Sequence, residues 1–228
     1  MALILSIETA TTNCSVAIHR NGELIACHEK NAMNIHATQL FVFIRQVMEE
    51  NALSFAQLNA VAVSKGPGSY TGLRIGVSAA KGLCYALNIP LLSVNTLQSM
   101  SFGAMPWVHE SNALLFPMID ARRMEVYNAV YSAKSEELVA TRALILTEHT
   151  FDEYLSSPCY FFGDGMPKLK AILPEHPNLR YLDDVQASAV SMGVPAYEAF
   201  GKGAFEDVAY FEPYYLKEFV SQHNFHKP

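Results

Sequence analysis

One order of predicted elements occurs twice along this chain of 228 residues. Each half opens with three short apolar or alternating segments, which are typical of an antiparallel meander. A helix, a buried strand, a glycine turn and a second helix then follow in each half. The two halves share negligible sequence identity, so the pattern alone repeats. A chain built this way is expected to fold into two similar α/β lobes.

The first half gives the clearest signals. Asn21-Gly22 is a strong hairpin signal, because both central residues of a type I′ turn need positive φ. Leu40, Ile44 and Val47 recur at helical spacing. The elements expected in this half are strands at 3–7, 14–20, 23–30, 60–64 and 91–94, helices at 36–51 and 72–87, and a further short helix capped by Thr96.

The second half repeats this order from about Met105-Pro106. We assign no element to 193–207, where Pro195 interrupts an otherwise helical pattern. The expected elements are strands at 113–119, 124–131, 139–146 and 160–162, a short helix before the last of these, a Gly163-Asp164-Gly165 turn and a helix near 167–173.

The duplication predicts a two-lobed α/β fold in which a mixed β-sheet with flanking helices occurs twice. This is the layout of the actin-like ATPase, or ribonuclease H-like, fold, with a cleft between the lobes. We place the first lobe at 1–105 and a smaller second lobe at 106–228. The last segment of the chain is expected to be able to pack back on the first lobe.

Composition narrows the function classes. Half of the residues are apolar and 17% are charged, so the chain can bury a sizeable core. The net charge is −6, and the densest basic pair, Arg122-Arg123, is not part of a larger cluster. This argues against a protein that binds nucleic acid without a partner. Leu3–Ile7 is too short for a signal peptide or membrane span. The four scattered cysteines indicate reduced thiols in the cytoplasm, not a zinc site or disulfides.

Four segments, in order along nearly the whole chain, resemble the bacterial TsaB (YeaZ) family of tRNA threonylcarbamoyladenosine biosynthesis proteins. Two residues depart from that family: Glu8 stands where Asp is usual, and Lys217 where Arg is usual. The first departure weakens any assignment of metal or phosphate handling near the first strand. The segments are IETATTNCSVA at 7–17, SKGPGSYTGLRIGVSAAKGL at 64–83, IDARRMEVY at 119–127 and PYYLK at 213–217.

The resemblance implies a required but non-catalytic subunit without a cofactor. In this family TsaB pairs with TsaD, a protein of similar fold. TsaD transfers the threonylcarbamoyl group to the adenosine beside the anticodon in tRNAs that read codons beginning with A. The ATPase TsaE completes the assembly. We therefore expect TsaD and TsaE as partners, tRNA contact only through the assembly, a homodimer when the chain is alone, and no membrane association.

The metal pair of TsaD-type enzymes is incomplete in this sequence. Those enzymes carry two His residues four apart on a helix, which places both imidazoles on one face. Here His36 is present, but Leu40 replaces the second ligand. A lone His at a helix start is more often a surface or capping residue than a ligand. We therefore predict neither a metal site nor a catalytic residue.

The glycine turn after residue 64 has two interpretations. Gly66, Gly68, Ser69 and Thr71 can form a vestigial phosphate site, because amide groups near a helix start can bind an anion. The same glycines also permit a tight turn, with Ser69 as the helix cap, and we favour this second interpretation. An independent ATPase or kinase of the actin-like superfamily remains the alternative function, although the chain contains no Gly-Gly pair for adenosine.

Two further groups of charged or glycine residues are given structural interpretations. Gly163-Asp164-Gly165 is interpreted as a turn. Asp120 and Glu125 flank a predicted hairpin turn, and exposed hairpin charges are usually just solvated. No Ser or Cys has a His placed by a recognisable motif, so nothing in the sequence predicts a nucleophile.

The helix at 72–87 presents one narrow polar stripe on an otherwise apolar surface. Such a helix is either buried within its lobe or covered by another protein, and the residues alone do not decide between these. The resemblance favours a TsaD interface on the two first-lobe helices. On this basis Val77→Glu or Phe41→Asp should abolish the TsaD complex without unfolding the chain. The predicted interface residues are Phe41, Arg45, Arg74, Val77, Ser78, Lys81 and Tyr85.

Overall fold

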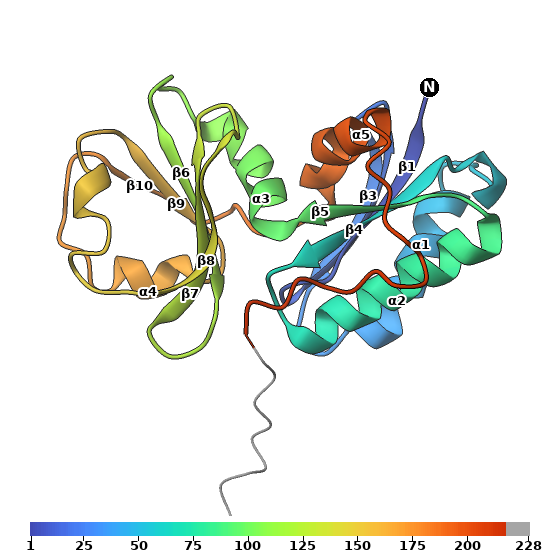
Figure 1. Ribbon diagram of the computed structural model, residues 1–228, viewed down its shortest axis with the longest axis horizontal. Helices are drawn as coiled ribbons and strands as arrows, with labels where there is room; N and C mark the ends of the chain where they lie inside the picture. Colours follow the sequence, from blue (N-terminus) through green and yellow to red (C-terminus); the bar gives the residue numbers. More distant parts are fainter. Residues whose placement is uncertain (218–228) are drawn as a thin grey trace, which may run out of the picture.

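The computed structural model describes residues 1–217, which form two lobes, each around a five-stranded sheet (Figure 1). The strand order is β3-β2-β1-β4-β5 in the first sheet and β10-β9-β6-β7-β8 in the second. In both sheets the first three strands in sequence are antiparallel and the last two run parallel to the central strand. The second sheet therefore repeats the first strand for strand, which confirms the predicted duplicated actin-like architecture.

The helices and strands follow the predicted order closely. In the first half they are β1 (Leu3–Glu8), β2 (Asn13–Arg20), β3 (Glu23–Asn31), α1 (His36–Glu49), β4 (Ala60–Gly66), α2 (Tyr70–Leu87), β5 (Leu91–Asn95) and α3 (Thr96–Ala104). In the second half they are β6 (Leu114–Asp120), β7 (Glu125–Ser132), β8 (Glu137–Ile145), β9 (Cys159–Phe162), α4 (Met166–Lys170), β10 (Leu179–Leu182) and α5 (Gly193–Gly201). Short 3₁₀ turns η1 to η4 lie at Phe55–Gln57, Met105–Trp107, Asp152–Tyr154 and Ala189–Met192.

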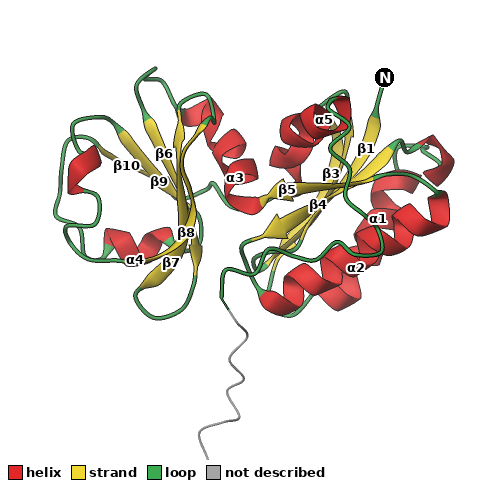
Figure 2. Ribbon diagram, viewed as in Figure 1, coloured by secondary structure: helices red, strands yellow, loops and turns green. Residues whose placement is uncertain are grey.

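The first sheet is covered on both faces, so its central strand is buried throughout. Leu5 and Ile7 pack on the side of α1 and α2, whereas Ile4 faces α5 and η4 on the opposite side (Figure 2). The β2–β3 hairpin turns at Asn21-Gly22, whose φ angles of 52° and 87° confirm the predicted type I′ signal.

The chain passes from one lobe to the other twice, and a helix marks each passage. Leu97 and Met100 of α3 pack against the second sheet, although α3 directly follows the first. Met192 of η4 and Ala196 of α5 pack on the first sheet after the chain has completed the second. The segment 193–207, to which the sequence assigned no element, therefore contains this returning helix. Pro195 lies in its first turn, where a missing N–H breaks no helical hydrogen bond.

Several local predictions were wrong. Asn95, not Thr96, caps α3, because its side chain accepts from the amides of Leu97 at 2.9 Å and Gln98 at 3.2 Å. The short helix expected before β9 is only the 3₁₀ turn η3, and the edge strand β10 was not anticipated. The division of the chain at residue 105 stays a proposal, and 218–228 of its second part lie outside the described residues.

Candidate functional site: an interlobe cleft and a groove between α1 and α2

The glycine turn brings the start of α2 directly onto the β1–β2 turn. A Cβ atom at Gly72 would lie 2.1 Å from the carbonyl oxygen of Thr9, and one at Gly68 would lie 2.4 Å from that of Ala10. The amide of Ser69 donates to the same Ala10 oxygen at 2.7 Å. These distances leave no room for any side chain at the two glycines.

A polar side chain of this turn also stabilises the start of α2. Ser69 is the N-cap of α2, as predicted, and its hydroxyl accepts from the amide of Gly72 at 3.3 Å. Gly66 has φ of 106°, which a residue with a side chain rarely adopts. These contacts favour the packing interpretation of the turn. Anion binding by Gly66, Gly68, Ser69 and Thr71 remains only a prediction.

A cleft of about 1070 Å³ separates the two lobes. Its first-lobe wall includes the glycine turn, and its second-lobe wall includes the β6–β7 turn at 120–123. Asp120 accepts from the ammonium of Lys168 at 2.7 Å, and Glu125 forms an ion pair with Lys217. The prediction that these two carboxylates are merely solvated was therefore wrong.

His36 also lines the cleft, and it was expected to be a surface or capping residue. It is buried instead, and the N-cap of α1 is Ile35, with no side-chain cap hydrogen bond. Burial lowers the pKa of His36, and its Nε2 has no hydrogen-bond partner. Leu40, one helical turn later, packs in the core, so the position of a second ligand faces away from the cleft. Within residues 1–217, no group of three or more His, Cys, Asp or Glu side chains is placed to hold a metal ion.

Glu8 is a buried carboxyl group that the sequence analysis did not place in the site. Its Oε1 accepts from the amide of Ala10 at 2.6 Å and from the hydroxyl of Ser64 at 2.7 Å. Its Oε2 is buried without a partner. Burial raises the pKa of this carboxyl to about 7, and the hydrogen bonds oppose the shift only in part. Glu8 thus holds the turn on which α2 rests.

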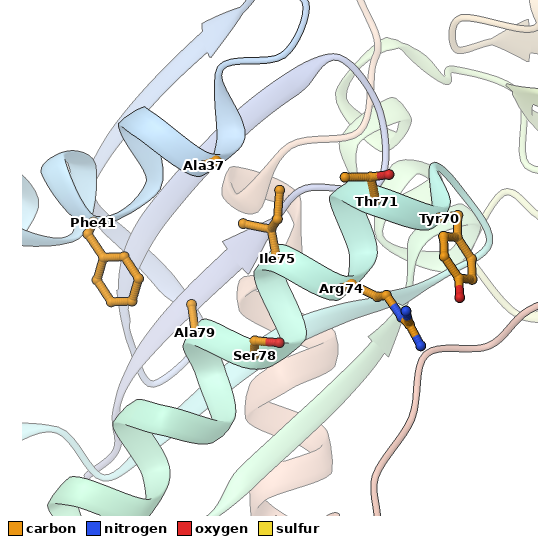
Figure 3. Close-up of a pocket in the computed structure, with 8 residues that line it drawn as sticks. All are labelled: Ala37, Phe41, Tyr70, Thr71, Arg74, Ile75, Ser78 and Ala79. Carbon is orange, nitrogen blue, oxygen red and sulfur yellow. The ribbon is translucent and has the colours of Figure 1, made fainter.

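An open groove of about 610 Å³ lies between α1 and α2 (Figure 3). Phe41 on α1 is 60% exposed. At the other end of the groove, the guanidinium of Arg74 lies 4.6 Å from the ring centroid of Tyr70. We call this feature the α1/α2 groove. It is lined by Ala37, Phe41, Tyr70, Thr71, Arg74, Ile75, Ser78 and Ala79.

The predicted interface residues separate into three groups. Five are exposed on α1 or α2: Phe41, Arg45, Arg74, Ser78 and Tyr85. Lys81 is only half-exposed, because its ammonium donates to the carbonyl oxygens of Ala209 at 3.0 Å and Phe211 at 3.1 Å.

Val77 belongs to neither of these groups, and its assignment to the interface was wrong. It is 4% exposed and packs in the first-lobe core. Its position falls on the inward face of α2 with Leu73, Ala80 and Cys84. A glutamate there would place a charge in the core, so Val77→Glu cannot separate docking from folding.

No helix among residues 1–217 has both the length and the apolar character needed to cross a bilayer. The family model described as "TsaD: tRNA N6-adenosine threonylcarbamoyltransferase" matches residues 28–217. The TsaB tRNA threonylcarbamoyladenosine biosynthesis protein of Escherichia coli (strain K12) is 30% identical over 224 residues, which cover 96% of each chain.

Solved structures extend this similarity to the fold. YeaZ from Pseudomonas aeruginosa superposes with a TM-score of 0.77 at 25% identity, over 95% of this chain and 100% of that one. An activator of 2-hydroxyisocaproyl-CoA dehydratase from Clostridium difficile has a TM-score of 0.50 at 9% identity, over 89% and 96% of the two chains, which shows the fold alone. The agreement in sequence and fold shows that this chain belongs to the TsaB (YeaZ) family of tRNA threonylcarbamoyladenosine biosynthesis proteins.

Proposed function

We propose that this chain acts in tRNA threonylcarbamoyladenosine biosynthesis as a non-catalytic subunit that binds a TsaD protein through the α1/α2 groove. The observation that carries the proposal is the exposure of two large aromatic side chains on neighbouring helices, Phe41 at 60% and Tyr85 at 85%. Aromatic and arginine side chains at the centre of a contact supply most of the affinity in protein complexes. Arg74 lies in the same groove.

The rest of the assembly follows the family. TsaE is proposed to join the TsaD complex, and tRNA to contact this chain only within it, in the cytoplasm. When TsaD is absent, the same groove is proposed to pair with a second copy of the chain. Small residues support close approach of a partner helix: nothing lies within 4 Å of the Cβ position of Gly82 on α2.

The proposal that the chain is non-catalytic rests on the cleft. The glycine turn is used for packing, and the carboxylates of Asp120 and Glu125 are each held by a lysine. Leu40 in the core replaces the second ligand that a TsaD-type metal site needs. These features favour a binding subunit over an independent ATPase or kinase.

The docking role predicts that Phe41→Asp raises the Kd for TsaD by at least about 30-fold, because loss of one central aromatic contact costs on the order of 2 kcal/mol. Isothermal titration with TsaD from the same organism measures this. The matched control is Leu138→Asp, which changes a 55% exposed side chain on β8 of the other lobe. Both variants should keep the wild-type melting temperature. Equal affinity of Phe41→Asp and wild type for TsaD would contradict the proposal.

A further inference from the structure

The end of the described chain, 206–217, lies outside the helices and the named strands, and we call it the strap; it includes a turn at 208–210. It starts at the open edge of the first sheet, where the amide of Glu206 donates to Leu91 at 2.9 Å. It then follows α2, held by the two hydrogen bonds from Lys81, while Phe211 packs against the first-lobe core. Figure 1 shows this segment in red, running from α5 past α2 toward the space between the lobes.

The strap next crosses the glycine turn and enters the cleft. The amide of Tyr214 donates to the carbonyl oxygen of Lys65 at 2.7 Å. The ring of Tyr215 lies 5.0 Å from that of Tyr70, centroid to centroid. Up to this point each of these contacts is made with the first lobe.

The last described residue of the strap contacts the second lobe. Lys217 forms an ion pair with Glu125 at the start of β7, and its ammonium lies 5.9 Å from the ring centroid of Tyr127. The Glu125 side chain is half-buried at 24% exposure, whereas the Lys217 side chain is 37% exposed. The other acidic group at this turn, Asp120, is already paired with Lys168. An ion pair with one half-buried partner is screened by salt less than a pair that lies fully in solvent.

Tyr70 connects the strap to both cavities, because it contacts Tyr215 and lines both the interlobe cleft and the α1/α2 groove. The other residues that line both cavities are Ala37, Thr71 and Ile75. Tyr215 of the strap contacts one side of this wall, while Arg74 lies over the Tyr70 ring. A movement of the strap end would therefore change the contact between Tyr215 and Tyr70 that supports this wall of the groove.

We propose that the strap is a latch: the Lys217–Glu125 pair holds the lobes closed and thereby sets the shape of the α1/α2 groove. The latch is a property of the chain alone. Its effect on the groove rests on the proposed TsaD-binding function. Partner docking and lobe closure are then coupled, because a partner that binds the groove of the closed form shifts the population toward closure.

The latch is tested on the full chain without any partner. Dyes attached at Glu49→Cys on α1 and Lys134→Cys in the second lobe report the interlobe distance by single-molecule fluorescence transfer. A Cys27→Ser background avoids stray labelling, since the other three cysteines are buried. Lys217→Ala should increase the ratio of open to closed molecules about fivefold, as expected for loss of one ion pair. A distribution identical to wild type would overturn the latch.

Two controls separate the latch from general loss of charge. Lys170→Ala removes an exposed pair with Asp183 that lies within the second lobe, and it should leave the distance unchanged. The double variant Lys217→Glu with Glu125→Lys restores an ion pair of reversed sign and should return the population toward the closed form. If the reversed pair stays as open as Lys217→Ala, the ion pair is not the latch.

The effect on the groove is measured separately, as the Kd for TsaD. Lys217→Ala should weaken binding by about the same factor as it reduces the closed population, and the reversed pair should restore it. An open Lys217→Ala protein that binds TsaD like wild type would overturn the coupling. If even wild type fails to bind TsaD, the proposed function is wrong, while the distance measurement still decides the latch.

Discussion

Gly72→Ala should lower the free energy of unfolding by about 3 kcal/mol, since overpacking against rigid atoms costs this much. The added methyl group would lie 2.1 Å from the carbonyl oxygen of Thr9, which is a backbone atom and cannot rotate away. Either α2 or the β1–β2 turn must then shift. Urea unfolding followed by circular dichroism measures the change.

The same helix supplies a matched control. Gly82 has no atom within 4 Å of its Cβ position, so Gly82→Ala adds a better helix former without a clash. It should raise the free energy of unfolding by about 0.4–1 kcal/mol. If both alanine variants have the stability of wild type, packing does not fix the glycine turn. The interpretation of Gly66 and Gly68 as a phosphate site would then be favoured.

Glu8 should make the protein less stable as pH rises from 4.5 to 8. Its folded pKa of about 7 lies above the ordinary value of 4.5, so between these values the folded state binds the proton and the unfolded state releases it. The stabilising contribution is complete below pH 4.5 and is lost as pH rises through 7. The shift corresponds to a loss of about 3 kcal/mol.

The comparison with Glu8→Gln isolates this group. Glutamine is neutral at every pH and can still accept from Ala10 and Ser64. The buried His19 and His36 have lowered pKa values, which act in the opposite direction, but they are present in both proteins. The difference in unfolding free energy between wild type and Glu8→Gln should therefore change by about 3 kcal/mol between pH 4.5 and 8. A constant difference would show that folding does not raise the pKa of Glu8.

The first lobe could be predicted well because its signals are local. Asn21-Gly22 fixes a hairpin, and Ser69 caps α2, each through contacts within three residues. The polar stripe on α2 correctly placed Arg74, Ser78 and Tyr85 on the outside. Val77 was misplaced, because its inward position follows from the spacing of Leu73, Ala80 and Cys84 and not from the apolar composition of the helix.

The contacts around the cleft and along the strap could not be predicted, because each joins distant parts of the chain. Lys217 and Glu125 are 92 residues apart, and Lys168 and Asp120 are 48 apart. Lys81 is a polar residue at surface spacing, but its hydrogen bonds reach carbonyl groups 128 and 130 residues later. Helix α5 has an apolar sequence that gives no sign of which sheet it covers. Only the three-dimensional arrangement assigns it to the first lobe.

Reconstitution of tRNA threonylcarbamoylation tests the central claim most directly. TsaD, TsaE, ATP, a threonylcarbamoyl donor and unmodified tRNA are combined with or without this chain, and modified adenosine is quantified by mass spectrometry of the nucleosides. The docking account predicts that modification requires the chain, that Phe41→Asp supports much less of it than Leu138→Asp, and that the chain alone neither modifies tRNA nor hydrolyses ATP. Full modification without the chain, or transfer by the chain alone, would contradict it.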